Sequence, residues 1–269
     1  MAMRSVFARS LLDLRRGLLW WSIGLAGMTA MMAAVYPSIR DNPALNRLVE
    51  DYPEALKAFI AFGGSVDYVS GAGYLGIELF SFMVPLLFVI AAVASGAAAI
   101  AGEEERGTLD LLLSQPVTRR GVAVAKISSA AAEIAVLTIV LWLSLWAGVA
   151  LFGMNVAAAN LLAASVTAGA LGLAFGAIAF LVGAATGRRA LAIGVTAALA
   201  VAAYLVNALA ALVSGLGPLQ KASPFYHYAV GDPLRQGVAP GHLSVLVAIA
   251  VISAAAGLVL FERRDIHSA

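Results

Sequence analysis

The feature that most constrains this chain is a set of six apolar stretches, each close to or above the ~20 residues that a helix needs to cross a bilayer. They lie at 18–36, 77–101, 127–152, 161–186, 190–217 and 242–261. The strands of an outer-membrane barrel would alternate apolar and polar residues, and these stretches do not. Hydrophobic residues make up 62% of the chain and charged residues 12%, whereas soluble domains carry about 25% charged residues. The sequence therefore predicts an all-α membrane protein with six transmembrane helices.

Several classes of function are disfavoured by what the sequence lacks. There is no cysteine, which excludes disulfides and thiolate metal sites. The P-loop pattern G-x-x-x-x-G-K-[ST] is absent, so we expect no ATP on this chain itself. His227, His242 and His267 are widely scattered and show no metal-ligand spacing, and a net charge of +2 gives no argument for nucleic acid. We expect one membrane domain over residues 1–269, without a cofactor or metal of its own.

Lysine and arginine between the apolar stretches indicate the orientation. With six spans both termini lie on one side, and that side carries 12 of the 17 basic residues, against 5 on the other. The twelve are Arg4, Arg9, Arg15, Arg16, Arg106, Arg119, Arg120, Lys126, Arg188, Arg189, Arg263 and Arg264. Cytoplasmic loops carry an excess of such residues. Both termini and the loop between the second and third spans are therefore predicted to be cytoplasmic.

The segments outside the spans also carry patterns. Residues 1–17 read as an amphipathic helix at the membrane interface, because apolar side chains fall near one face and arginines flank them. A cleaved signal peptide is disfavoured, since the apolar run after it is longer than the usual ~7–15 residues. On the outer side, residues 37–75 contain two signals for short helices, at Pro43 and Pro53. Residues 218–241, rich in proline and glycine, predict a turn-rich loop.

The charged segment 102–120, GEEERGTLDLLLSQPVTRR, separates the second and third spans. Each ionised side chain inside a bilayer costs at least ~2.5–3.5 kcal/mol, so the segment must project into water. A helical projection of residues 103–114 puts Leu109, Leu112 and Leu113 on one stripe, with Glu105 and Arg106 at its edges. A solvated loop that only fixes the topology would explain the arginines. It would not explain the three acids, which contribute little to orientation, or the exposed leucines. The pattern is typical of a short helix that a soluble partner binds.

The same segment and its continuation, GEEERGTLDLLLSQPVTRRGVAVAK, resemble the signature of ABC-2-type transporter permeases: a pair of glutamates shortly before G-T-L-[DE]-x-L-L-[ST]-x-P-[VI]-[ST]-R, with a later lysine. The matching residues are Glu104, Glu105, Gly107, Thr108, Leu109, Asp110, Leu112, Leu113, Ser114, Pro116, Val117, Thr118, Arg119 and Lys126. Two weaker similarities are SPFYHYAVGDPLRQG at 223–237 and FERRDI at 261–266. A CAAX-type membrane protease is disfavoured, because Thr108 and Leu109 stand where that motif needs arginine.

This resemblance implies a six-helix permease subunit that does no chemistry itself and transports in the inner membrane of a bacterium or archaeon. It implies a dimer with an identical or homologous permease, and two ABC ATP-binding subunits that hold ATP and Mg²⁺. The loop between spans two and three would be the coupling helix that docks on the ATPase and links ATP hydrolysis to export. The residues to which this role would fall are Glu103, Glu104, Glu105, Arg106, Gly107, Thr108, Leu109, Asp110, Leu112, Leu113, Pro116 and Arg119.

Three polar residues lie within or beside the spans. Glu133 reads equally well as a carboxylate on a substrate path and as a residue paired with an arginine near the inner interface. Glu78 is predicted to lie at the outer interface, and Asn207 to hydrogen-bond between helices. If Glu133 and Glu78 handled ions, the chain would instead be a six-span ion-coupled secondary transporter or channel, which is the alternative interpretation.

Overall fold

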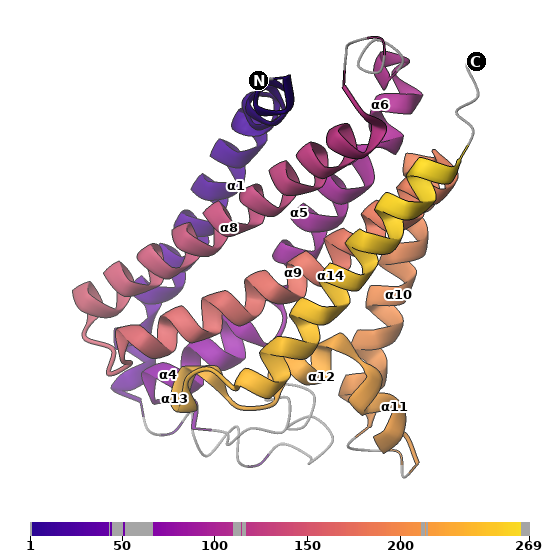
Figure 1. Ribbon diagram of the computed structural model, residues 1–269. Helices are drawn as coiled ribbons and strands as arrows, with labels where there is room; N and C mark the ends of the chain where they lie inside the picture. Colours follow the sequence, from indigo (N-terminus) through magenta and orange to yellow (C-terminus); the bar gives the residue numbers. More distant parts are fainter. Residues whose placement is uncertain are drawn as a thin grey trace.

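The computed structural model describes residues 2–42, 67–109, 117–210 and 215–264, together with positions 44, 51, 114 and 213. The regular elements in these residues are all helical, as predicted (Figure 1). They are α1 (Ala2–Arg40), α4 (Gly71–Leu75), the π-helical turn η1 (Gly76–Phe80), α5 (Met83–Ala99), α6 (Ala101–Glu105), α8 (Arg119–Phe152), α9 (Ala158–Thr186), α10 (Arg189–Leu209), α11 (Gly217–Ala222), α12 (Pro224–Ala229), α13 (Pro233–Gln236) and α14 (Pro240–Arg263).

The described helices match the predicted spans with two corrections. Five of them are long and apolar enough to cross a membrane, and a sixth span results if the bent pair Gly71–Phe80 and Met83–Ala99 counts as one. The predicted span 190–217 is too long, because α10 ends at Leu209. Its apolar composition continues, but Gly215 takes a φ of 109° and α11 begins at Gly217.

The predicted span 77–101 is likewise not one straight helix. The pieces before Ser81 and after Phe82 meet at an angle of 40°. Pro85, in the first turn of α5, has no N–H to donate to the carbonyl of Ser81, and Phe82 leaves helical geometry with a φ of −142°. The proline therefore explains a break in this span, and not merely a curve.

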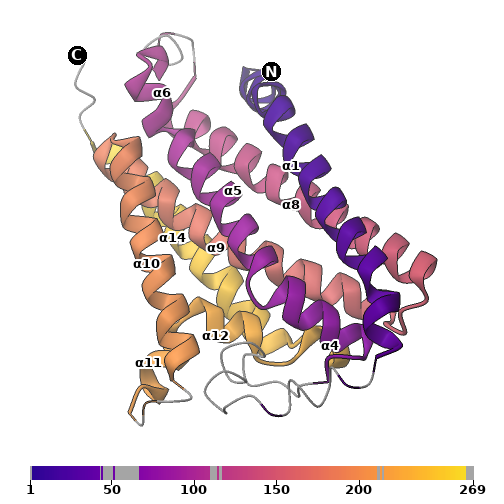
Figure 2. The ribbon, with the colours of Figure 1, turned by 180° about the vertical axis from the view of Figure 1, so that it is seen from behind.

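The centre of the bundle is α9, whose side chains are mostly buried. α5 and α14 both run along α9, while α1 packs against α8 (Figures 1 and 2). The crossing of α5 and α9 is close because both helices carry glycine there: a Cβ built on Gly96 would lie 2.1 Å from the carbonyl oxygen of Gly176. Small residues at such crossings are what membrane helices use to bring backbones together.

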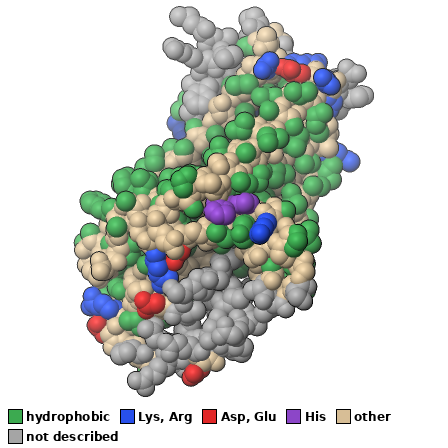
Figure 3. All heavy atoms as spheres, turned by 60° about the horizontal axis from the view of Figure 1, so that its bottom comes forward, with side chains coloured by type: hydrophobic (Ala, Val, Ile, Leu, Met, Phe, Trp, Pro, Cys, Tyr) green, Lys and Arg blue, Asp and Glu red, His purple; other side chains and the backbone are tan. Residues whose placement is uncertain are grey.

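The elements divide between two ends of the molecule. The start of α1, α6 and the end of α14 lie at one end, and α4, α11 and α13 at the other (Figure 1). Charged side chains gather mainly towards the two ends, with a band of hydrophobic side chains between them (Figure 3). The first of these two ends is called the α6 end below, and that it faces the cytoplasm stays a prediction.

Segments outside the spans differ in part from expectation. The turn-rich loop predicted at 218–241 holds α11, α12 and α13, two of which begin directly with proline. The N-terminal helix predicted over 1–17 is not assigned as a separate element: α1 runs from Ala2 to Arg40, and the candidate span within it begins at Leu12. Its position at a membrane surface stays a prediction. The two helices predicted at Pro43 and Pro53 lie almost wholly outside the described residues.

Candidate functional site

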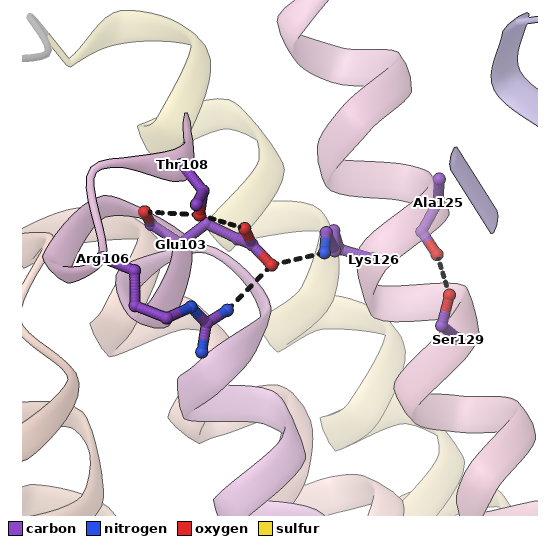
Figure 4. Close-up of polar contacts among 6 residues, drawn as sticks. All are labelled: Glu103, Arg106, Thr108, Ala125, Lys126 and Ser129. Carbon is purple, nitrogen blue, oxygen red and sulfur yellow. Dashed lines mark hydrogen bonds and ion pairs between the residues drawn. The ribbon is translucent and has the colours of Figure 1, made fainter. Parts of the chain in front are cut away.

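Three consecutive carboxylates at the α6 end, Glu103, Glu104 and Glu105, each contact a different helix. Glu103 is the most buried. Its Oε1 accepts hydrogen bonds from Lys126 Nζ on α8 at 2.6 Å and from Arg106 Nη2 at 2.9 Å, and Thr108 Oγ1 donates to Oε2 (Figure 4). Burial would raise the pKa of Glu103, but these hydrogen bonds and the two cations outweigh it and hold the pKa below its ordinary value. Glu103 is therefore ionised at neutral pH and fixes α6 to the start of α8.

Glu104 reaches the end of α14. Its carboxylate accepts a hydrogen bond from Arg264 Nη2, and both side chains are mostly buried. The main-chain carbonyl of Arg264 in turn accepts a hydrogen bond from Arg119 Nη1, at 3.0 Å, from the first turn of α8. These two contacts link α6, the first turn of α8 and the end of α14 at one point, although the residues are far apart in the sequence.

Glu105 contacts α10. Its Oε1 accepts a hydrogen bond from the main-chain N–H of Arg189, at 2.8 Å, and Arg189 is the first residue of that helix. The N-cap residue Arg188 offers no side-chain cap. A carboxylate at a helix N-terminus satisfies a free N–H and interacts favourably with the helix dipole, so Glu105 caps α10 from another element. Glu103, Glu104, Glu105 and these partners are called the acidic junction below.

The backbone around the acidic junction differs from the predicted helix over 103–114. α6 ends at Glu105, and Gly107 takes a φ of 66°, a conformation that favours glycine. Leu109 does not face solvent but is buried, at 1% exposure, in a cluster with Ile100, Phe180 and Phe261. The prediction of an exposed stripe is therefore wrong for Leu109, because the turn at Gly107 rotates it towards the bundle. Asp110, Leu112, Leu113 and Pro116 lie outside the described residues.

Chemically, the junction is suited to hold helices together. Its acids are engaged by cations and a main-chain N–H of the same chain. Within the described ranges, no group of three or more histidine, aspartate or glutamate side chains is placed to hold a metal ion. The site is a mechanical connection between α6 and the ends of α8, α10 and α14.

A family model described as ABC-2 family transporter protein matches residues 6–266, nearly the whole chain. The chain belongs to the ABC-2 transporter family. It is a multi-pass membrane permease of an ABC transporter, a class that works with an ATP-binding subunit. A search of curated proteins gives no match.

The other polar residues singled out in this ABC-2 permease do not come together in one site. Glu133 on α8 is 5% exposed, and its Oε2 has no hydrogen-bond partner among the described residues; the predicted pairing with an arginine finds no counterpart there. Glu78 lies in η1, where its Oε1 accepts a hydrogen bond from Tyr68 Oη at 2.6 Å. Asn207, near the end of α10, is buried and contacts Gln220 of α11.

Two features escaped the sequence reasoning. Arg264 was counted only for topology, yet it joins Glu104 to α8. His227 and His242 were read as scattered, but their Nδ1 atoms lie 2.9 Å apart and the pair sits on the surface (Figure 3). His227 Nε2 also lies 2.9 Å from the carbonyl of Lys221. The motif SPFYHY could have suggested this, since Ser223 caps α12 and α12 packs against α14.

Proposed function

We propose that this chain is the membrane-spanning permease subunit of an ATP-driven ABC-2 exporter, with no enzymatic activity of its own. ATP and Mg²⁺ would be held by a separate ABC ATP-binding subunit, two copies of which would serve a dimer of this permease or of this chain with a homologous one. The α6 end would face the cytoplasm of a bacterium or archaeon.

The observation that carries this proposal is the acidic junction within a chain of this family. A docked ATPase can move a permease only if its docking segment is mechanically tied to the spans. Glu103, Glu104 and Glu105 provide such ties to α8, α14 and α10. An ordinary solvated loop would need none of them.

The structure changes how docking should be tested. Reversing the charge of Glu104 or Glu105, or replacing Leu109, would break contacts inside the permease as well as any contact with a partner. A photo-crosslinking amino acid at exposed Arg106 or Ser114 tests proximity itself. At Arg106 it removes the exposed cation from Glu103, but Lys126 still pairs with that carboxylate. We expect crosslinks from both positions to a P-loop ATPase in native membranes, and none from Val238 at the opposite end, which is also exposed. Absence of any ATPase among the crosslinked products would refute the proposal.

The ion-coupled alternative rests on one observation, the buried Glu133 oxygen without a described partner. It predicts that the purified chain, reconstituted alone, moves ions down an imposed gradient, and that Glu133→Gln abolishes the flux. The exporter proposal predicts no such flux without the ATPase.

A further inference from the structure

We infer that Arg264 is a positioning residue through which the α6 segment, residues 101–109, moves the last span, α14. The inference rests on the proposed function, because it concerns how movement of a docked ATPase reaches the spans. It starts from the ion pair between Glu104 on α6 and Arg264, which directly follows α14. Both side chains are mostly buried, so solvent screens this pair less than it screens a surface pair.

An apolar contact accompanies the ion pair. Leu109 from the α6 segment and Phe261 from the last turn of α14 belong to one buried cluster, with exposures of 1% and 0%. Phe261 lies three residues before Arg264, so the two contacts join the same turn of α14 to the same segment. A displacement of that segment cannot leave α14 behind without breaking both.

The turn between α9 and α10 limits the freedom of the pair. A Cβ built on Gly187 would lie 2.7 Å from both carboxylate oxygens of Glu104 and 2.6 Å from Arg264 Nη1. The ion pair is therefore seated directly against the backbone of this turn. The pair fits because glycine has no side chain at this position. The backbone of Gly187 leaves little space for Glu104 and Arg264 to shift relative to one another.

The packing of the rest of α14 allows it to move with the α6 segment. Much of the helix faces outward: Val251 and Ile252 are 61% and 67% exposed, and only Leu246, Gly257 and Phe261 are buried among its described residues. Its inward contacts are mainly with α9, where a Cβ on Gly257 would meet the ring of Phe180 at 2.7 Å. A helix held on one side and tied at its end can tilt when that end is moved.

The test uses the complex of permease and ATPase and exploits the absence of cysteine. Arg16 of α1 and Arg263 of α14, both exposed, are each replaced by cysteine and spin-labelled. Pulsed electron paramagnetic resonance then measures the distance between the two labels. It is measured without nucleotide and with a non-hydrolysable ATP analogue. The variants are Glu104→Arg, Arg264→Glu and the double exchange. Arg120→Glu is the matched control, because Arg120 on α8 and Glu262 on α14 form an exposed pair at 3.8 Å that also reaches the last turn of α14.

We expect the nucleotide to change the distance between the labels in the parent protein and in Arg120→Glu. Each single reversal should abolish this change while the ATPase stays bound. The double exchange should restore it. Persistence of the change in either single reversal, or no return in the double exchange, would overturn the inference. So would loss of ATPase binding in Arg264→Glu, since Arg264 would then act in docking. If the parent protein binds no ATPase at all, the proposed function fails instead.

Discussion

Replacing Lys126 by methionine tests whether Glu103 is a buried, paired carboxylate. Only 11% of the Lys126 side chain and 12% of the Glu103 side chain are exposed, and their charged atoms lie 2.6 Å apart. Removing one partner of a buried ion pair costs about 3–5 kcal/mol. Arg106 stays 2.9 Å from the same oxygen, but its side chain is 56% exposed, so its compensation is partial. We expect Lys126→Met to lower the free energy of unfolding by about 2–3 kcal/mol, a roughly 30- to 150-fold change in the equilibrium constant.

The assay is reversible unfolding by denaturant in mixed micelles, monitored by circular dichroism. Replacing both partners, as in Glu103→Leu with Lys126→Met, leaves no buried uncompensated charge, because Arg106, which also loses its partner, is 56% exposed and stays hydrated. We therefore expect the double variant to recover most of the loss. Arg120→Met serves as the control, because its side chain is 72% exposed and such pairs contribute about 0–1 kcal/mol. A loss below about 1 kcal/mol for Lys126→Met, or a double variant no more stable than the single one, would refute a buried, paired Glu103.

Gly96→Ala should destabilise the protein by about 1–3 kcal/mol or more, because the new methyl group would lie 2.1 Å from a backbone oxygen of α9. Gly194→Ala should be neutral or stabilising, because a methyl group there would meet nothing within 4 Å. Unfolding by denaturant compares the stabilities of the two variants. Leu109→Ala should cost about 2–5 kcal/mol by leaving a cavity, and a cost near zero would mean that Leu109 is exposed. The pKa of His227 lies below its usual value, mainly through burial. The unfolded chain therefore binds more protons than the folded one, and thermal stability should fall as the pH drops below about 6.5, but less steeply in His227→Gln.

The spans could be predicted from the sequence because apolar length is a local property. The six apolar stretches could be found without any knowledge of packing. The errors lie at helix ends, where length alone is not decisive: α10 ends at Leu209 although apolar residues continue, and Pro85 breaks the second span. Both depend on backbone geometry at single residues.

The sequence pointed to the acidic junction, but it did not show what the three carboxylates contact. The sequence correctly marked Glu103, Glu104 and Glu105 as unusual in a loop beside the membrane. It could not show where they point, because their partners Lys126, Arg264 and Arg189 stand 23, 160 and 84 residues away. A helical projection of 103–114 also assumed continuous geometry, which Gly107 interrupts.

The direction of the acids alters the surface that a partner would meet. Glu103 and Glu104 are turned inward and Glu105 is occupied by the N-terminus of α10. The exposed charges at the same end are mostly basic: Arg106, Arg119, Arg120, Arg188 and Arg263 outnumber the exposed acids Glu105 and Glu262. A docking groove complementary to the described part of this end would therefore be acidic, and not basic as the three glutamates alone suggest. In a membrane permease a charge beside a span can set topology, hold helices together or bind a partner, and here burial assigns two of the three acids to the second role.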